Sequence, residues 1–359
     1  MMGADRALPD PAMLFRQLFD NVSSTYTYLL AGGRGGEALI IDPVFERVDR
    51  YIALAAELEL RLVMALDTHV HADHITGLAA LRDRTKCITA MGKMAKVDVV
   101  SFRFDDGDAI EIDGVRLGAL YTPGHTDDSY CFTLPDRVFT GDTLLIRGTG
   151  RTDFQNGDAR AAYRSLTEKL LVLPDATLVY PGHDYKGDTV STIGEERAFN
   201  PRLKATSAEA YAAEMASLAL PNPKMMDVAV PANLKIGAHQ RAEGGETWSV
   251  EAVEALREIE KPDLVLIDLR DDNERRRAGA IPNAVQVPYR DLVHALHPGG
   301  LVHYEAIKGR KRIVFYCAFG ERSALAVKSA HESGLFNVCH LVGGIDAWRQ
   351  AGGAVESIA

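Results

Sequence analysis

Residues 68–74 (THVHADH) place the imidazoles of His69, His71 and His74 and the carboxylate of Asp73 within seven positions. They follow the apolar run 62–66 (LVMAL), which predicts a buried strand. Functional side chains commonly lie in the loop at such a strand end. Imidazole and carboxylate are ligands for first-row metals. A single histidine beside an apolar run would be a core residue, but four ligand-type side chains this close together predict a metal site.

Three later strand ends repeat this arrangement. His125 ends the stretch 122–125 (TPGH), Asp142 ends 139–142 (FTGD), and His183 ends 177–183 (TLVYPGH). One ligand-type residue at a strand end means little by itself. Three of them downstream of the first cluster predict several loops that converge on one metal centre.

The elements that must position these residues are short strands and amphipathic helices. Glycines between two strand-like runs predict a hairpin. After the hairpin, apolar residues recur at helical spacing, which predicts an amphipathic helix. In the first half we expect strands at 25–30, 38–42, 62–66, 109–112 and 115–120, and helices at 48–58, 75–81 and 208–218. In the second half we expect helices at 249–260, from 290, at 323–332 and through 348, alternating with strands at 264–269, 284–287, 313–316 and 338–342. That alternation predicts a parallel α/β domain.

Length and charge limit the class of protein. A chain of 359 residues favours two domains, and prolines and glycines place the boundary near residues 238–246. The formal net charge of −10 and the lack of a long apolar stretch argue against nucleic-acid and membrane partners. The N-terminus lacks the apolar region of a secretory signal. The four cysteines are widely spaced, as in a reducing compartment, so we expect a cytoplasmic protein.

The pattern His-x-His-x-Asp-His, followed by the single His125, Asp142 and His183, resembles the metallo-β-lactamase fold over roughly residues 14–205. This resemblance implies a four-layer αβ/βα sandwich. Three further stretches resemble the persulfide dioxygenases of that superfamily: 122–129 (TPGHTDDS), 150–155 (GRTDFQ) and 191–203 (STIGEERAFNPRL). The glyoxalase II thioesterases share the ligand set but are not typified by these stretches.

The resemblance to persulfide dioxygenases implies one Fe(II) per chain, held by His69, His125 and Asp142, with open positions for substrate and dioxygen. The remaining ligand-type residues would then orient the ligands through hydrogen bonds. They are His71, Asp73, His74 and His183. The same residues would also suit a binuclear site in which Asp142 bridges and Asp73, His74 and His183 hold a second metal. Spacing alone leaves both arrangements open.

The implied reaction is oxidation of glutathione persulfide by O2 and water to sulfite and glutathione. Four residues are candidates for contacts to glutathione or for support of the ligands: Arg151, Tyr185, Lys186 and Arg197. For each of them, a solvent-exposed charge or a tyrosine at the edge of the core is an equal alternative.

A second constellation follows the predicted strand 313–316. The loop 317–323 (CAFGERS), between a strand and a helix, resembles the active-site loop of the rhodanese sulfurtransferases. The stretches 280–284 (AIPNA) and 341–348 (LVGGIDAW) resemble other recurring parts of that family, although Asn283 stands where glycine is usual. Backbone N–H groups at such a loop stabilise a thiolate and its persulfide. We therefore expect Cys317 to relay sulfur from thiosulfate to glutathione, with Arg322 supplying charge to thiosulfate and fixing the loop. A phosphatase-like loop fits less well, because it is usually one residue longer before its arginine.

Together these features predict a metallo-β-lactamase αβ/βα sandwich followed by a rhodanese-like parallel α/β domain. The expected boundaries are 1–237 for a persulfide dioxygenase domain, 238–248 for a linker and 249–359 for a rhodanese domain. The expected partners are small molecules, and a homodimer is compatible with this interpretation. One rival is a binuclear thioester hydrolase with a sulfur-carrier domain. A second is a persulfide sensor without catalysis, which would not need seven metal-type residues.

Overall fold

The computed structural model describes residues 13–358 apart from 219, 221, 222, 224, 237–247 and 260. The chain divides into two compact units. One comprises Met1–Val97 and Arg103–Lys235, and the other comprises Asp98–Phe102 and Ile236–Ala359. The predicted linker at 238–248 lies outside the described residues, apart from its last position.

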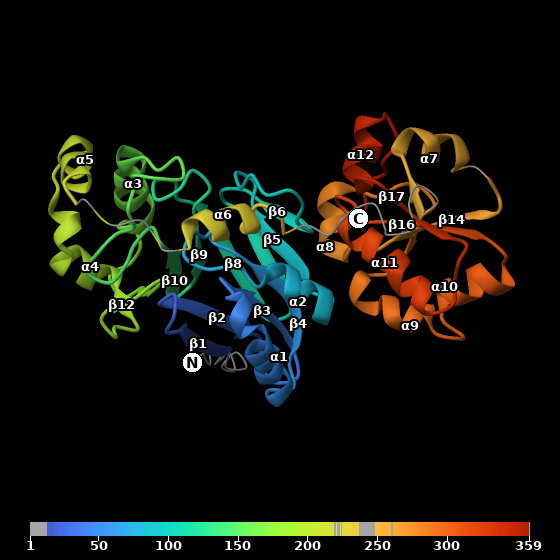
Figure 1. The fold of residues 1–359 in the computed structure, drawn as a ribbon, viewed down its shortest axis with the longest axis horizontal. Helices are drawn as coiled ribbons and strands as arrows, with labels where there is room; N and C mark the ends of the chain where they lie inside the picture. The colour runs from blue at the N-terminus through green and yellow to red at the C-terminus, as the bar shows by residue number, and fades with distance from the viewer. Residues whose placement is uncertain are drawn as a thin grey trace, which may run out of the picture. The chain divides into compact units, whose positions relative to one another are not determined.

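The first unit contains two six-stranded sheets (Figure 1). The first sheet has the order β1-β2-β3-β4-β5-β6. Its strands are β1 (Leu14–Asp20), β2 (Thr25–Ala31), β3 (Glu37–Ile41), β4 (Arg61–Leu66), β5 (Ile88–Gly92) and β6 (Phe102–Phe104). β1, β2 and β3 are antiparallel, whereas β3, β4 and β5 are parallel. The predicted hairpin of β2 and β3 is confirmed.

The second sheet has the order β12-β11-β10-β9-β8-β7. Its strands are β7 (Ala109–Ile112), β8 (Val115–Tyr121), β9 (Tyr130–Leu134), β10 (Arg137–Gly141), β11 (Leu178–Pro181) and β12 (Ser191–Thr192). β10 and β11 are parallel, whereas the pairs β7–β8, β8–β9, β9–β10 and β11–β12 are antiparallel. Because β8, β10 and β11 run in the same direction, their carboxyl ends share one edge of the sheet.

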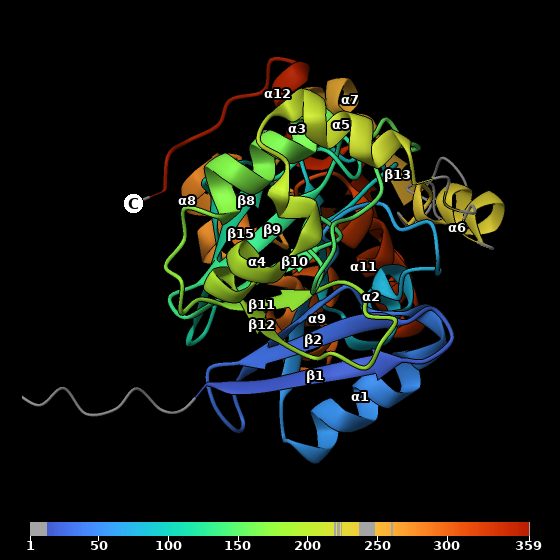
Figure 2. The same ribbon diagram turned by 90° about the vertical axis from the view of Figure 1, so that its left-hand side faces the viewer.

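Helices cover the outer faces of both sheets (Figures 1 and 2). α1 (Val48–Glu57) and α2 (Leu78–Thr85) pack on the first sheet. The second sheet is covered by α3 (Ala159–Arg164), the π-helical segment Ser165–Leu170, α4 (Ile193–Phe199) and α5 (Ala208–Ala216). Buried Leu166, Ile193 and Tyr211 from these helices form one core with Val138 and Val179 of the sheet. The predicted αβ/βα sandwich is therefore confirmed. A further helix, α6 (Met226–Asn233), completes the unit.

The second unit is a five-stranded sheet of order β13-β17-β16-β14-β15, in which every pairing is parallel. Its strands are β13 (Ser249–Val250), β14 (Leu264–Asp268), β15 (Val285–Gln286), β16 (Arg312–Tyr316) and β17 (Val338–Leu341). α7 (Ala252–Glu258) and α12 (Gly344–Gln350) pack on one face, and α9 (Leu292–Leu296), α10 (Leu301–His303) and α11 (Glu321–Glu332) pack on the other (Figure 1). Coverage of both faces is typical of parallel sheets and confirms the expected α/β domain. α8 (Asp272–Ala278) follows β14.

Two predicted helices begin later than expected. The helix expected at 249–260 starts at Ala252, because Ser249 and Val250 pair with His340 and Leu341 as an edge strand. The helix expected at 75–81 is α2, which starts at Leu78. Among the described residues, no helix combines the length and the apolar character needed to cross a membrane.

Candidate active sites

The predicted metal-type residues of the first unit follow the carboxyl ends of four strands. The 68–74 loop follows β4, His125 follows β8, Asp142 follows β10 and His183 follows β11. Ligand atoms of His69, His125 and Asp142 all lie within 4.8 Å of one another, as do those of His71, Asp73 and His74. The fold thus brings together the residues that the sequence singled out.

Two of these histidines are held in one orientation through their Nδ1 atoms. His69 Nδ1 lies 2.9 Å from the hydroxyl of Thr68, which donates to Asp42 at 3.0 Å. His125 Nδ1 donates to the carbonyl of Arg151 at 2.7 Å. Each contact leaves an Nε2 lone pair for a metal, and such a hydrogen bond at the other ring nitrogen is typical of metal-binding histidines.

The second group has a different set of contacts. Asp73 Oδ2 accepts a hydrogen bond from Thr25 at 3.1 Å and lies 2.9 Å from His74 Nδ1. His71 Nε2 lies 3.2 Å from Asp42 Oδ1. Within the described part of the chain, three buried atoms here have no hydrogen-bond partner: His71 Nδ1, His74 Nε2 and Asp142 Oδ1. Buried polar atoms are normally satisfied, so these three are consistent with a site that binds a cation.

The electrostatics of the site favour a cation as well. Burial lowers the pKa of His69 and of His71 well below the usual value, so both are neutral and able to ligate. Burial also acts to lower the pKa of His183, but Asp142 and Asp73 outweigh it and raise that pKa to about 9. Nε2 of His183 lies 3.5 Å from a carboxylate oxygen of each. The field of the two carboxylates that raises this pKa would also stabilise a metal ion.

Two glycines allow the backbone to approach Asp142 closely. A Cβ atom at Gly182 would lie 2.6 Å from Asp142 Oδ1, and one at Gly150 would lie 2.0 Å from the Asp142 carbonyl oxygen. Any larger residue would therefore displace the carboxylate or the loop that carries it. This explains in physical terms why glycine occupies position 182, next to His183, and position 150, at the start of the stretch 150–155.

Sequence reasoning missed several residues that support the site. Asn233, at the end of α6, donates to the carbonyl oxygens of His71 and His74 at 2.9 Å each and accepts from the Thr76 N–H at 2.9 Å. No local pattern marks Asn233. Asp42, in contrast, follows β3 as the other ligand-type residues follow their strands, and that signal could have identified it.

The four candidates for substrate contacts differ in position. Arg151 lies beside His125 and pairs with Asp153 at 2.6 Å. Tyr185 stacks on His183 with ring centroids 5.9 Å apart, and it is 73% exposed. Lys186 follows it in the same exposed turn, whose backbone N–H groups donate to Asp184. Arg197 pairs instead with Asp175. Asp175 precedes β11, whereas His183 follows it, so the two residues lie at opposite ends of this strand.

The second site is the loop between β16 and α11. Cys317 follows β16 directly and is buried. The Gly320 N–H donates to Cys317 Sγ at 3.2 Å. Gly344 packs against the loop so closely that a Cβ atom there would lie 2.4 Å from the Cys317 carbonyl oxygen, and the Ile345 N–H donates to that oxygen at 2.9 Å. The two resembling stretches therefore form one structural unit around the thiol.

Arg322 lies in the first turn of α11, directly after this loop, and is directed toward α8. Its guanidinium donates to both carboxylate oxygens of Glu274, at 2.5 and 2.8 Å, and is buried. Burial acts to lower the pKa of Arg322, but Glu274 outweighs it and raises that pKa. These contacts favour the loop-fixing part of the role predicted for Arg322 over direct contact with thiosulfate.

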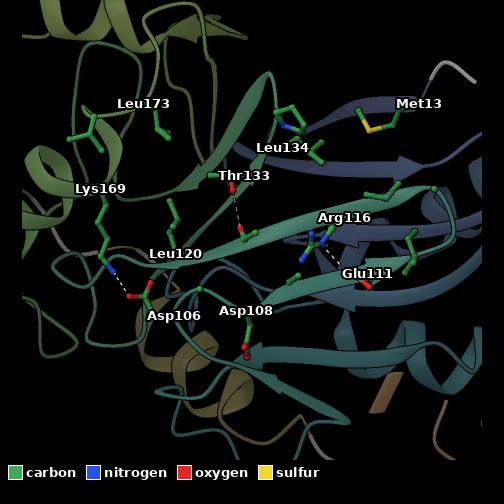
Figure 3. Close-up of a pocket in the computed structure, with 18 of the residues that line it drawn as sticks. Met13, Asp106, Asp108, Glu111, Arg116, Leu120, Thr133, Leu134, Lys169 and Leu173 are labelled. Atoms are coloured by element: carbon green, nitrogen blue, oxygen red, sulfur yellow. Dashed lines mark hydrogen bonds and ion pairs between the residues drawn. The ribbon is translucent and has the colours of Figure 1, made fainter. Parts of the chain in front are cut away.

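A broad hollow of about 1210 Å³ lies over β7, β8, β9 and the π-helical segment (Figure 3). Two ion pairs lie there, Lys169 with Asp106 at 2.7 Å and Arg116 with Glu111 at 2.7 Å. None of the residues that line this hollow belongs to the metal cluster or to the cysteine loop. We therefore place the chemistry elsewhere, at the strand ends described above.

Comparison with protein families agrees with this division. Residues 20–183 match the metallo-beta-lactamase superfamily, and residues 251–351 match the rhodanese-like domain. All metal-type residues of the first unit fall in the first match, and Cys317 and Arg322 fall in the second.

Individual relatives are more specific. The chain is 46% identical over 228 residues to the mitochondrial persulfide dioxygenase ETHE1 of Homo sapiens, covering 63% of this chain and 89% of that protein. The crystal structure of ETHE1 from Myxococcus xanthus is 52% identical, with a TM-score of 0.60, and the match covers 62% of this chain and 98% of that one. A metallo-beta-lactamase of Staphylococcus aureus is 20% identical, with a TM-score of 0.58. The match covers 92% of this chain and 99% of that chain, and it shows the fold alone. The chain therefore belongs to the persulfide dioxygenase family of the metallo-beta-lactamase superfamily, with a rhodanese-like domain fused behind it.

Proposed function

We propose that the first unit oxidises glutathione persulfide at one Fe(II) ion, according to GSSH + O2 + H2O → GSH + SO3²⁻ + 2H⁺. The observation that carries this proposal is the grouping of His69, His125 and Asp142 within 4.8 Å, with both imidazoles oriented through Nδ1. Two histidines and one carboxylate on one face are the ligand set of non-haem iron oxygenases. A ferrous ion held in this way supplies redox chemistry and open coordination positions.

We propose one metal rather than two from the contacts of Asp73, although His71 Nδ1 and His74 Nε2 of the same group have no hydrogen-bond partner among the described residues. The Oδ2 atom of Asp73 already meets Thr25 Oγ1 and His74 Nδ1, so a second cation would have to compete with these groups. Asp73, His74 and His183 then act as a charged and hydrogen-bonded frame for Asp142, whose Oδ2 lies 3.5 Å from Nε2 of both His125 and His183. In this frame His74 and His183 are buried, whereas Asp73 is partly exposed.

Tyr185, Arg151 and Lys186 are proposed to bind the glutathione part of the substrate. Partial desolvation, followed by the charges of Asp142 and Asp73, raises the pKa of the largely exposed Tyr185, so its hydroxyl keeps its proton and can donate to a substrate anion. Arg151 lies beside His125, and Lys186 lies beside Tyr185 on the same exposed turn. Guanidinium and ammonium groups suit the two carboxylates of glutathione. We leave Arg197 out of this role because of its pairing with Asp175.

The second unit is proposed to transfer sulfur from thiosulfate to glutathione. The thiolate of Cys317 attacks the outer sulfur of thiosulfate, the S–S bond breaks, and its electron pair leaves with sulfite. The thiolate of glutathione then attacks the outer sulfur of the Cys317 persulfide and releases the Cys317 thiolate. The net reaction is S2O3²⁻ + GSH → SO3²⁻ + GSSH. The Gly320 N–H, 3.2 Å from Sγ, supports the anionic sulfur in both steps.

Oxygen uptake by the purified full-length chain tests the first reaction. With glutathione persulfide we expect uptake of one O2 for each sulfite formed, and about one iron per chain by metal analysis. The rival hydrolase predicts two metal ions per chain, hydrolysis of glutathione thioesters and no oxygen uptake. That result would overturn the proposal.

A further inference from the structure

Gln155 is the last residue of the stretch 150–155, and the proposed reaction gives it no role. Its amide nitrogen donates to the carbonyl oxygen of Val70 at 2.9 Å, across 85 positions of sequence. Because a carbonyl oxygen only accepts, the amide nitrogen must face Val70, and the amide oxygen is turned away from it. That oxygen is buried and has no hydrogen-bond partner within the described residues. Buried polar atoms are normally paired, so this one needs an explanation.

The backbone of Gln155 is also unfavourable. Its φ is +49°, and that of Asn156 is +57°, so two consecutive residues other than glycine lie in the left-handed region. Asparagine tolerates this region, but a long side chain such as that of glutamine rarely adopts it. Such strain persists only where the surrounding structure holds it in place, and it is concentrated at functional sites. Gln155 therefore combines a strained backbone with an unpaired buried atom.

The loop of residues 150–157 wraps around His125. The carbonyl of Arg151 accepts from His125 Nδ1 at 2.7 Å, and the ring of Phe154 lies edge-on to the imidazole, with centroids 5.7 Å apart. A Cβ atom at Gly157 would lie 2.9 Å from the His125 carbonyl oxygen. The loop that carries the glutamine is therefore built around this proposed ligand.

Val70 lies on the other side of the contact, directly after the proposed ligand His69. Its N–H donates to Asp128 Oδ2 at 2.9 Å, and its carbonyl oxygen accepts from Gln155, so both peptide planes next to Val70 are fixed. Asp128 comes three residues after His125, so both partners of Val70 belong to segments next to His125. The rings of His69 and His125 lie nearly perpendicular, with centroids 4.9 Å apart. The two hydrogen bonds therefore set the position of one ligand relative to the other.

We propose that Gln155 is a positioning residue that acts through Val70 to hold His69 at the separation from His125 that a single metal ion requires. This inference rests on the proposed metal site and adds to it a residue that is not a ligand. The donor amide explains why glutamine occupies the position. The left-handed backbone and the unpaired oxygen oppose folding, whereas the hydrogen bond to Val70 serves the geometry of the ligands. Supporting contacts of this kind typically change metal affinity by about 10- to 100-fold.

The test compares the stability of the metal-free full-length chain with its affinity for Co(II), which serves as a spectroscopic probe of the site. Gln155→Met removes the donor and the unpaired oxygen together while keeping a side chain of similar length. We expect the Co(II) affinity, measured by competition with a chelator, to fall by about 10- to 100-fold. The visible absorption bands of bound Co(II), which depend on coordination geometry, should shift.

The stability of the metal-free chain should respond differently. Gln155→Met leaves the Val70 carbonyl without its donor, but it also removes a buried oxygen that had no partner, and these two effects oppose each other. The midpoint temperature of unfolding should therefore stay within about 2 °C of the unaltered chain. A residue with a merely structural role would instead lower the midpoint temperature and the affinity together.

Two further variants separate the amide from its surroundings. Gln155→Glu keeps the shape of the side chain, but an ionised carboxylate has no proton to donate to Val70. It should lower the Co(II) affinity at least as much as Gln155→Met does. Asn156→Gly, the matched control, changes the adjacent left-handed residue and leaves the Gln155 amide in place. It should leave the affinity and the absorption bands unchanged.

An unaltered Co(II) affinity in Gln155→Met would overturn the proposal, as would a midpoint temperature that falls with the affinity. An equal loss of affinity in Asn156→Gly would also overturn it, because the effect would then belong to the loop and not to the amide. If Gln155→Met does not fold, Gln155→Gly, which also relieves the backbone, decides by the same two measurements. Oxygen uptake with glutathione persulfide is measured in parallel on the unaltered chain. Its absence would refute the proposed oxidation, while Co(II) binding would still judge the role of Gln155.

Discussion

Arg322 and Glu274 form a buried ion pair with two parallel hydrogen bonds, although 48 positions of sequence separate them. Glu274 also accepts from the Asp271 N–H at 3.1 Å as part of the capping box that starts α8. One carboxylate therefore ties the start of α8 to the loop that carries Cys317. The loop depends for its shape on a residue of another element.

Removal of Glu274 should destabilise the second unit strongly. Glu274→Ala leaves a buried guanidinium without its partner, which typically costs about 3–5 kcal/mol. Urea unfolding of the full-length chain should show this loss in the transition of the second unit, together with loss of sulfur transfer. Glu305→Ala, which removes a partly exposed pair with Lys311, is the control and should cost about 1 kcal/mol or less. Equal effects of the two variants would contradict this account.

Cys317→Ser should separate the two reactions. A hydroxyl is a poor nucleophile here and forms no persulfide, so thiosulfate:glutathione transfer should be abolished, whereas oxygen uptake with glutathione persulfide should continue at the unaltered rate. Cys339→Ala, at a buried thiol of β17, should retain both activities. Equal loss of both reactions in Cys317→Ser would break the two-site model.

His125→Ala should release the metal and stop oxygen uptake. Loss of one ligand among three leaves the cation poorly held, and we expect the affinity to fall by more than about 100-fold. Metal analysis after dialysis measures this directly. The exposed His294→Ala should bind as much iron as the unaltered chain. Full uptake by His125→Ala would exclude His125 from the ligand set.

Asn233→Ala should weaken metal binding without touching a ligand. Three hydrogen bonds from one side chain to the backbone at His71, His74 and Thr76 hold the shape of the metal loop. Changes in such supporting contacts typically reduce metal affinity by about 10- to 100-fold. Asn233→Asp should be at least as damaging, because a carboxylate would face two carbonyl oxygens. Competition with a chelator measures the affinity, and exposed Asn337→Ala is the control. An unchanged affinity would show that the metal loop keeps its shape without the hydrogen bonds of Asn233.

Asp20 should make stability depend on acidic pH. Burial acts to raise its pKa, but hydrogen bonds from Ser23 and Arg47 outweigh burial and lower it. A carboxylate with a lowered pKa in the folded state contributes stability above its unfolded pKa of about 3.9 and loses it as pH falls through the folded value. The difference in unfolding free energy between the unaltered chain and Asp20→Asn should therefore shrink between about pH 5 and pH 2. A difference that grows toward low pH would reverse the assigned sign.

The Asp20 turn also bears on the metal site. It precedes Ser24, whose carbonyl accepts from His183 Nδ1 at 3.1 Å, and Thr25, which donates to Asp73. In the unaltered chain, protonation of Asp20 should therefore loosen this turn before the metal is released.

Local sequence patterns were enough to predict the strand ends, the residue types placed on them and the class of each domain. Apolar runs followed by His69, His125, Asp142 and Cys317 are local patterns, and each can be identified within a window of a few residues. The alternation of strands and helices in the second half is equally local, so the parallel α/β domain could be predicted from it.

Only the tertiary structure decided which residues support those sites. Asn233 reaches His71 across 162 positions, His340 reaches Ser323 from a neighbouring strand, and Arg197, which belongs to a resembling stretch, faces away from the metal cluster. The start of the helix at Ala252 was set by strand pairing of Ser249 and Val250. The physical reason is the same in each case. Local sequence encodes backbone preference and the direction of a side chain, but the partner of a buried polar group is chosen by the packing of elements that lie far apart along the chain.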